Sequence, residues 1–350
     1  MKKLIHGGDI YTKRNTKEKI IDFSANINPL GLPNSVKQAI IDNIDSYESY
    51  PDPLCRELRE RLSQHIKINK DNIICGNGAA DLIFKVTMAL KPKKALLIAP
   101  TFAEYEEALN LVESEIQYYE LNEQNNFIID ENILNCISPQ LDIMFICNPN
   151  NPTGIAIKKE EVIKIAKVCK SNNVILVVDE CFTDFLIEEY EYSICEYLNE
   201  YNNVIILKAF TKIYAMAGIR LGYMLCSNKS ILSKVSNIGQ PWSVSTVASK
   251  CGVAALDEVD YVNKTKLYIK NNREYLKKEL EALGYKVFPS QVNYILFKSK
   301  DTSIKEKLEY YGILIRSCSN YKVLDNKYFR IAVKSRSDNE YLISCLKEIG

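Results

Sequence analysis

The sequence predicts an α/β protein in which a mostly parallel sheet is sandwiched between helices, accompanied by a smaller α+β domain. From about residue 70 to about residue 240, apolar strand-like runs alternate with amphipathic stretches such as residues 160–173. Strands that alternate with helices in this way form parallel sheets whose two faces are both covered. The strand-like runs cover residues 95–100, 142–149, 174–180, 203–210 and 220–226.

The pattern changes in the last part of the chain, where a second domain is expected. A charged helical stretch runs from Asp257 to about Leu283, and short strands and helices follow it. This mixture predicts a separate α+β domain. Residues 1–46 are too few to bury a core alone, so we expect them to complete it. The expected partition is a large domain over residues 47–245 and a small domain made of residues 1–46 and 246–350.

Charge and cysteine content exclude several classes of function. The 350 residues include 45 Lys plus Arg and 44 Asp plus Glu, a net charge of +1, which predicts neither a nucleic-acid nor a membrane partner. We expect no signal peptide and no membrane span, because no apolar run is long enough. The eleven cysteines form no CxxC pair and only two histidines are present, so we expect a reduced, cytoplasmic protein without a metal site.

Polar motifs follow the predicted strands at the edge of the sheet where ligands bind in open α/β folds. They are GNGAAD (76–81), NPNNPTG (148–154), DE (179–180) and FTK (210–212). Taken singly, each motif has a structural explanation: a turn, a helix cap or a surface ion pair. For Lys212 two interpretations remain, because it follows a buried strand: its ammonium reaches solvent past an apolar surface, or it takes part in a reaction.

Taken together, the motifs match what pyridoxal phosphate requires of a protein. Lys212 can form a Schiff base with the cofactor aldehyde once burial and nearby positive charge lower its pKa. Asp179 suits the pyridinium nitrogen, and Asn151 can donate a hydrogen bond to the ring hydroxylate. Phe102 can stack on the face of the ring.

The cofactor phosphate has a predicted site as well. Gly78, Ala79 and Ala80 would place backbone N–H groups at a helix N-terminus, which attracts anions. Arg220 can add a charge-assisted contact. We also include Thr211, the neighbour of the predicted Schiff-base lysine, among the cofactor-binding residues.

In this order of motifs the sequence resembles fold-type I pyridoxal-phosphate enzymes of the class I/II aminotransferase superfamily. NPNNPTG, DE, TK, an arginine eight residues after the lysine and a C-terminal FR follow one another as in that family. The resemblance implies the cofactor roles given above. It also implies that Arg330 holds the substrate α-carboxylate. Tyr50, in SYPDP, resembles the tyrosine that reaches the partner subunit's cofactor phosphate, so a homodimer is implied.

Two branches of the family share the YPDP and NPxNPTG patterns: histidinol-phosphate aminotransferases and threonine-phosphate decarboxylases of cobalamin synthesis. HGGDIY (6–11) and DFSANINPLGLP (22–33) resemble the decarboxylase branch, as do QPWSVS (240–245) and IRSCSNY (315–321). Phe182 points the same way, because many aminotransferases carry a tyrosine there. Ala209 departs from relatives that place Ser or Thr at that position.

The predicted reaction is therefore decarboxylation of threonine phosphate, with amino transfer on histidinol phosphate as the alternative. The intact cofactor set argues against a third reading, a regulator without catalysis. His6 and Asn28 are the first candidates for the substrate phosphate, and Arg316 and Arg336 are further ones. Serine phosphate differs from threonine phosphate by one methyl group, which the sequence does not discriminate.

Overall fold

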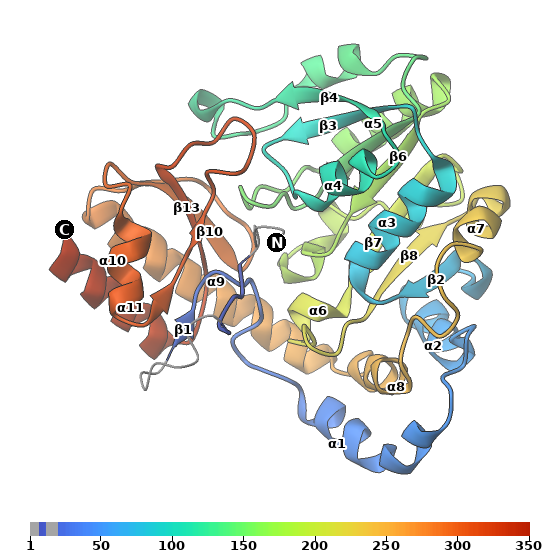
Figure 1. The fold of residues 1–350 in the computed structure, drawn as a ribbon, viewed down its shortest axis with the longest axis horizontal. Coiled ribbons are helices and arrows are strands. Elements are labelled where there is room, and N and C mark those ends of the chain that lie inside the picture. The colour runs from blue at the N-terminus through green and yellow to red at the C-terminus, as the bar shows by residue number, and fades with distance from the viewer. Residues whose placement is uncertain (1–6, 12–19) are drawn as a thin grey trace.

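The computed structural model describes residues 7–11 and 20–350, and within these ranges seven strands form one large sheet (Figure 1). Their order across the sheet is β2-β8-β7-β6-β5-β3-β4, and β8 alone among them runs antiparallel to both of its neighbours. The α/β class predicted from the sequence is confirmed. The strands are β2 (Ile73–Gly76), β3 (Lys94–Ala99), β4 (Glu115–Glu120), β5 (Ile143–Cys147), β6 (Ile175–Asp179), β7 (Val204–Ala209) and β8 (Gly222–Cys226).

Both faces of the large sheet are covered by helices, because its central strands are apolar on both sides. One hydrophobic cluster joins alternate strand residues such as Leu97 and Phe145 to α3 (Gly78–Leu90), α4 (Glu104–Asn110) and α7 (Lys229–Ser236). The residues between them, such as Met144, belong to a second cluster that includes the apolar face of α5 (Lys159–Ser171). Alternation of side chains along each strand therefore builds two separate layers.

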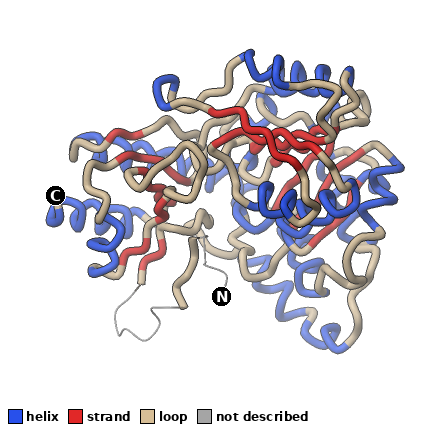
Figure 2. Tube along the Cα trace, turned by 45° about the horizontal axis from the view of Figure 1, so that its top comes forward, coloured by secondary structure: helices blue, strands red, loops and turns tan. Residues whose placement is uncertain are grey.

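A second, smaller sheet lies beside the first, and the tube in Figure 2 shows the strands gathered in two groups. It is antiparallel, in the order β12-β13-β10-β9, and packs against the helices of the C-terminal part of the chain. Its strands are β9 (Lys286–Val287), β10 (Tyr294–Lys298), β12 (Arg316–Ser317) and β13 (Tyr328–Ala332), and its helices are α9 (Val259–Ala282), α10 (Ile304–Tyr310) and α11 (Arg336–Ile349).

The N-terminal segment contacts both the part of the chain around the small sheet and the helices beside the large sheet. Its strand β1 (Ile21–Asp22) pairs in parallel with β11 (Ile313–Leu314), and the next residue, Phe23, accepts a hydrogen bond from the backbone of Ala332. The following helix α1 instead packs against α8, which in turn packs against α2. Because this segment contacts both parts, the division into two domains at residues 46 and 245 stays a prediction. These helices are α1 (Asn34–Asp42), α2 (Arg56–Ile66) and α8 (Thr246–Ala255), and the short α6 (Phe210–Ile213) follows β7.

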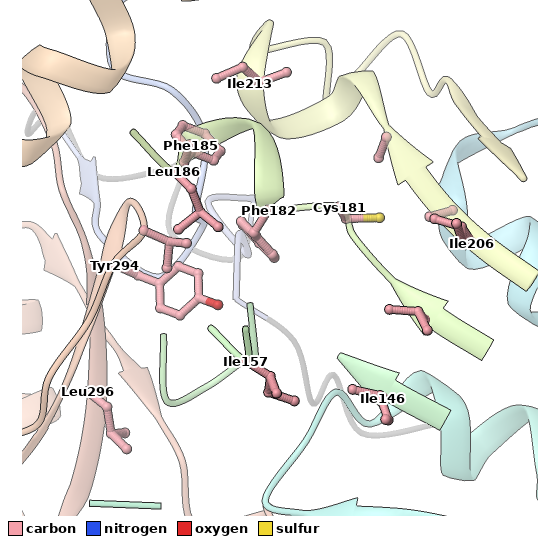
Figure 3. Packing of buried hydrophobic residues seen from close by; sticks show 14 of the residues in the cluster. Ile146, Ile157, Cys181, Phe182, Phe185, Leu186, Ile206, Ile213, Tyr294 and Leu296 are labelled. Atoms are coloured by element: carbon pink, nitrogen blue, oxygen red, sulfur yellow. The ribbon is translucent and has the colours of Figure 1, made fainter. Parts of the chain in front are cut away.

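Aromatic packing joins the two sheets where the loop after β6 meets β10 (Figure 3). The ring of Phe182 stands edge-on to that of Tyr294, with centroids 5.0 Å apart, and Phe185 packs beside them. The hydroxyl of Tyr294 donates to the backbone oxygen of Asn150, 2.8 Å away. The ends of the large-sheet strands are thereby held against the small sheet.

No helix in the described ranges has the length and apolar character needed to cross a membrane.

Candidate active site

A cavity of about 320 Å³ lies where the carboxyl ends of the large-sheet strands face β12 and β13. Its walls bring together most residues that the sequence singled out. From the large sheet and its helices come Ala79, Ala80, Phe102, Asn151, Asp179, Thr211, Lys212 and Arg220. From the other side come Gly7, Ser24, Ala25, Asn26, Arg316, Tyr321 and Arg330.

Lys212 reaches the cavity because β7 ends at Ala209 and the chain turns at once into α6. Burial lowers the pKa of Lys212 to about 8, and the positive charges of Arg330 and Arg220 act in the same direction. At pH 7 about a tenth of the side chain is therefore a neutral amine, far more than for a lysine with the ordinary pKa. A neutral amine at a cavity wall is a nucleophile toward a carbonyl compound.

Asp179 ends β6 and is 5% exposed, with both carboxylate oxygens held by donors. Its Oδ2 accepts from the hydroxyl of Tyr105 at 2.7 Å, and its Oδ1 accepts from the backbone N–H of Cys181 at 3.0 Å. Burial raises the pKa of Asp179, while these donors and the nearby Lys212 oppose that shift. A cation entering the cavity would meet a fixed carboxylate.

An anion site forms where α3 begins. Gly78 has φ +83°, and a Cβ there would come within 2.7 Å of the Arg220 Nη2, so only glycine fits. Arg220 itself has φ +66° and donates through Nη1 to the backbone oxygen of Ala217 at 3.2 Å. The first N–H groups of a 13-residue helix and a guanidinium thus converge on one point of the cavity.

Two arginines lie opposite each other on neighbouring strands, because the register of β12 and β13 pairs Arg316 with Arg330. Arg330 is 5% exposed and donates to Asn151 Oδ1 at 2.5 Å and to the backbone oxygen of Ser24 at 2.7 Å. Its Nε is buried and has no hydrogen-bond partner within residues 7–11 and 20–350. Two like charges facing each other across a sheet are unfavourable without anions between or beside them.

Arg316 is held in place by its own hairpin. Its Nη2 donates to Asn320 Oδ1 at 2.7 Å, and its guanidinium lies 5.6 Å from the ring centroid of Tyr321. Tyr321 also lines the cavity. The guanidinium is therefore directed by a short local contact and an aromatic ring, and does not hang free in solvent.

The sequence reasoning missed Asn26. This side chain is 3% exposed, lines the cavity, and its Oδ1 has no partner in the described part of the chain. The sequence analysis instead predicts Asn28, two residues later, as a residue that binds the substrate phosphate. The backbone turns between them, with the N–H of Ile27 donating to the oxygen of Ala25, and no sequence signal marks which asparagine faces inward.

Asn28 and Arg336, both predicted substrate-binding residues, do not line the cavity. The Asn28 amide nitrogen donates to Ile213 O, Tyr261 Oη and Thr265 Oγ1, at 2.7, 2.9 and 2.8 Å, and so joins α6 to α9. Arg336 begins α11 on the surface. It is ion-paired with Glu340 at 2.6 Å and stacked 3.5 Å above the ring of Tyr275.

Neither Tyr50 nor Gly78 lines the cavity of this chain, although Ala79 and Ala80, which follow Gly78, do. Tyr50 is 80% exposed and stacks on Trp242, with ring centroids 4.6 Å apart. His6 lies outside the described residues, although the next residue, Gly7, is at the cavity wall.

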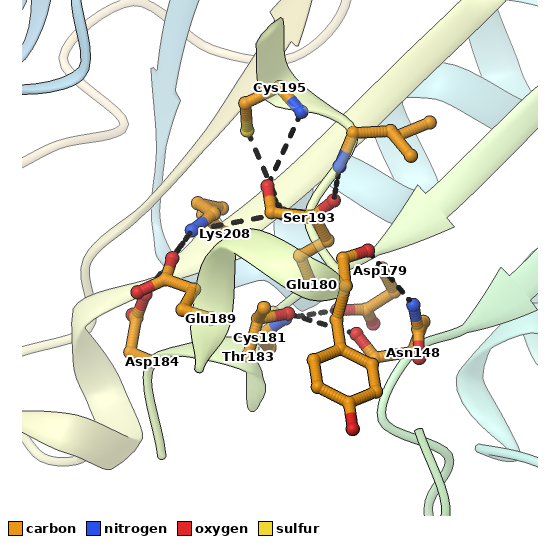
Figure 4. A network of polar contacts seen from close by, with 12 residues as sticks. Asn148, Asp179, Glu180, Cys181, Thr183, Asp184, Glu189, Ser193, Cys195 and Lys208 are labelled. Carbon is orange, nitrogen blue, oxygen red and sulfur yellow. Dashed lines mark hydrogen bonds and ion pairs between the residues drawn. The ribbon is translucent and has the colours of Figure 1, made fainter. Parts of the chain in front are cut away.

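A buried charge cluster lies behind the cavity and ties β7 to the loop after β6 (Figure 4). Lys208 is 5% exposed, and its Nζ lies 2.9 Å from Glu189, 3.2 Å from Asp184 and 3.7 Å from Glu180. Burial raises the pKa of Asp184 to about 6, whereas the charge of Lys208 lowers the pKa of Glu189 to about 2. Glu180 is fully buried and accepts from the backbone N–H of Ile194 at 2.9 Å.

The described residues contain no grouping of three or more His, Cys, Asp or Glu side chains that could hold a metal ion. All eleven cysteines are free thiols.

Known proteins resemble this chain over almost its whole length. A family model described as aminotransferase class I and II matches residues 18–346. The threonine-phosphate decarboxylase of Salmonella typhimurium is 36% identical over 98% of the chain and 96% of that protein. The histidinol-phosphate aminotransferase of Methanosphaera stadtmanae is 30% identical over 95% and 91%. The crystal structure of the histidinol-phosphate aminotransferase from Clostridium acetobutylicum superimposes with a TM-score of 0.87 at 31% identity, covering 93% of this chain and 98% of the other.

The charge cluster behind the cavity yields a stability prediction. Lys208→Met leaves the fully buried Glu180 and the half-buried Asp184 and Glu189 without this ammonium, so we expect the free energy of unfolding to fall by about 3 kcal/mol. Lys250→Met is the matched control, because Lys250 pairs with Glu57 at the surface and its loss should cost at most about 1 kcal/mol. Urea unfolding of both variants and the wild type measures the difference, and equal effects would contradict the prediction.

Proposed function

We propose that this chain, which belongs to the class I and II aminotransferase family, is a pyridoxal-phosphate enzyme that decarboxylates O-phosphothreonine. The product would be an aminoalkyl phosphate for cobalamin synthesis in the cytoplasm. Family membership agrees with the resemblance drawn from the motifs. The proposal for the reaction rests on the geometry of the substrate side of the cavity.

The observation that carries the proposal is the pair Arg316 and Arg330, opposed on β12 and β13 and both at the cavity wall. O-phosphothreonine carries a carboxylate and a phosphate on neighbouring carbon atoms, so one molecule supplies an anion for each guanidinium. The unpaired Nε of Arg330 is a ready donor to the carboxylate. The unpaired Oδ1 of Asn26 lies in the same wall, and as an acceptor it suits a hydrogen-bond donor of the ligand and not an anion.

The residues on the sheet side fit pyridoxal phosphate. Lys212 would hold the aldehyde, and its lowered pKa favours that attachment. Asp179 would face the pyridinium nitrogen as a fixed buried carboxylate. The turn at Gly78, which has no room for a Cβ beside Arg220, leaves a cradle for the phosphate. Phe102 lines the same wall and would cover the ring.

The chain's own groups then divide the work of the reaction. Bound pyridoxal phosphate supplies the electron sink that accepts the electron pair of the bond broken at Cα. Arg330 would hold the carboxylate, and Arg316 would hold the phosphate, so the two contacts fix the rotation of the substrate. As the Cα–carboxylate bond breaks, carbon dioxide leaves. The Lys212 ammonium then returns a proton to Cα as general acid.

An aminotransferase of the histidinol-phosphate type is the second candidate, supported by the close structural match to such an enzyme. Histidinol phosphate carries only one anionic group, which would leave one of the two arginines without an anion in that substrate. We therefore place the decarboxylase first. The two reactions differ in their products and in their need for an amino acceptor.

We further propose that the enzyme is a homodimer in which Tyr50 contributes to the partner's site. The exposed fractions of Ile41, Ile44 and Leu54 are 62%, 64% and 52%, and Tyr50 itself is 80% exposed. Large apolar side chains gathered on one stretch of chain favour a protein interface. The ring of Trp242 holds Tyr50 in a defined position on that surface.

The reaction prediction uses the purified holoprotein. O-phosphothreonine should release carbon dioxide without 2-oxoglutarate, and Lys212→Ala should abolish that release. Borohydride treatment of the wild type should fix the cofactor covalently to Lys212, as located by peptide mass spectrometry. Amino transfer to 2-oxoglutarate without carbon dioxide would favour the second candidate, and an adduct on another lysine would refute the site.

The substrate-side prediction compares two arginines that the sequence alone did not separate. Arg316→Gln should raise KM for O-phosphothreonine about 10- to 100-fold, because hydrogen bonds to a charged phosphate are lost. Arg336→Gln should leave KM within about twofold, since that side chain is on the surface. Steady-state kinetics of both variants measure this, and a reversed order would move the phosphate to the other arginine.

The dimer prediction relies on mixed subunits. Lys212→Ala and Tyr50→Ala homodimers should both be impaired. A mixed dimer contains one site with an intact lysine and an intact tyrosine if Tyr50 crosses between subunits. Coexpression with two affinity tags should therefore restore activity. A mixed dimer as inactive as its parents, or an active monomer in sedimentation, would refute the shared site.

A further inference from the structure

The fully buried phenol of Tyr105 is a feature of the site that the proposed reaction does not yet use. Its hydroxyl donates to Asp179 Oδ2 at 2.7 Å, from α4 across to the end of β6. Its ring stacks on Phe145, with centroids 5.1 Å apart and an interplanar angle of 20°. The direction of the hydroxyl is therefore set by packing, because the ring has no space in which to move.

The same ring also supports the aromatic wall of the cavity. Phe102 stands edge-on to Tyr105, with centroids 5.7 Å apart and an interplanar angle of 83°. One side chain thus contacts both Asp179 and Phe102, the two groups that would meet the nitrogen and the face of the cofactor ring. Tyr105 therefore joins the turn before α4 to β5 and to the end of β6.

The hydroxyl matters because of where Asp179 is buried. A buried carboxylate tends to take up a proton, and donors to its oxygens favour the charged form. The phenol stays a donor, since burial raises its own pKa well above the ordinary value. The other ionisable groups around Asp179 are Lys212 from α6, the Cys147 thiol from β5, the Cys181 thiol beside it and the Tyr294 phenol from β10.

Among these groups, Lys212 is a poor substitute for Tyr105. Its pKa is lowered to about 8, and the amine has to be neutral to attach to the cofactor, so its electrostatic support of Asp179 depends on its protonation state. The hydrogen bond from Tyr105 does not change with the state of the lysine.

We propose that Tyr105 is a positioning residue that keeps Asp179 ionised and aimed at the ring nitrogen of the bound cofactor. The inference rests on the proposed function for the placement of the cofactor. It adds the requirement that the carboxylate be charged before the cofactor arrives, and it assigns the Tyr105 hydroxyl a share of that task beside the donors of Cys181.

The test measures cofactor affinity as a function of pH, without relying on turnover. Apoprotein is titrated with pyridoxine 5′-phosphate, which lacks the aldehyde, so attachment to Lys212 makes no contribution. In the wild type, affinity should fall as pH drops through the pKa of Asp179. In Tyr105→Phe that fall should begin about 1–2 pH units higher, the equivalent of one hydrogen bond to a charged group.

The matched control is Tyr294→Phe. Tyr294 is also fully buried, but its hydroxyl donates to the backbone oxygen of Asn150, so its removal should leave the pH midpoint unchanged. Titration of the phosphate group is common to all variants and cancels in the comparison. If the midpoint of Tyr105→Phe equals that of Tyr294→Phe, the assignment is overturned.

A third variant separates this inference from the function on which it rests. Asp179→Asn removes the charge and should weaken binding over the whole pH range. If it does so while Tyr105→Phe behaves like the control, only the role of Tyr105 fails. If Asp179→Asn binds as tightly as the wild type at every pH, the placement of the cofactor is wrong and the inference falls with it.

Discussion

The relative position of Asp179 and Lys212 depends on one buried ion cluster centred on Lys208. A buried ammonium is costly unless carboxylates surround it. Glu180 and Glu189 supply that charge from the loop after β6, while Lys208 itself is on β7. The two strand ends therefore cannot separate without exposing unpaired charge to the interior. Asp179 directly precedes Glu180, one carboxylate of the cluster, and Lys212 is four residues after Lys208. The cluster therefore fixes how far apart Asp179 and Lys212 lie.

The second constraint is that the cavity is completed by parts of the chain far apart in sequence. Arg330 on β13 donates to Asn151 of the large sheet and to Ser24 of the N-terminal segment. The bond to Asn151 joins the small sheet to the large one, beside the bond from the Tyr294 hydroxyl to the backbone oxygen of Asn150. An anion at the unpaired Nε would add to bonds already made. Substrate binding would then reinforce the closed arrangement and would not have to create it.

Sequence patterns predicted what is local and missed what depends on tertiary direction. Lys212 and Asp179 were identifiable because a polar residue directly after a buried apolar strand must emerge at the sheet edge. The strand β4 was missed because EIQYYE is half-exposed and lacks a continuous apolar run. The reversed direction of β8 has no sequence signature either. Asn28 was preferred to Asn26 because a turn between them decides which one faces inward, and that turn is set by contacts with α6 and α9.

The charge balance of the cavity explains how one lysine can serve two opposite tasks. The charged side chains at the wall are Lys212, Arg220, Arg316, Arg330, Asp179 and Glu104. In the free protein burial lowers the pKa of Lys212 and the guanidinium groups lower it further, which favours the neutral amine. An anion bound to Arg220 or Arg330 offsets part of that positive field and shifts the lysine back toward the ammonium form. Because such coupling is reciprocal, the protonated lysine also favours retention of the anions. Under the proposed function, the same side chain would be a nucleophile while the cavity holds no anions and a proton donor once both phosphates and the carboxylate are bound.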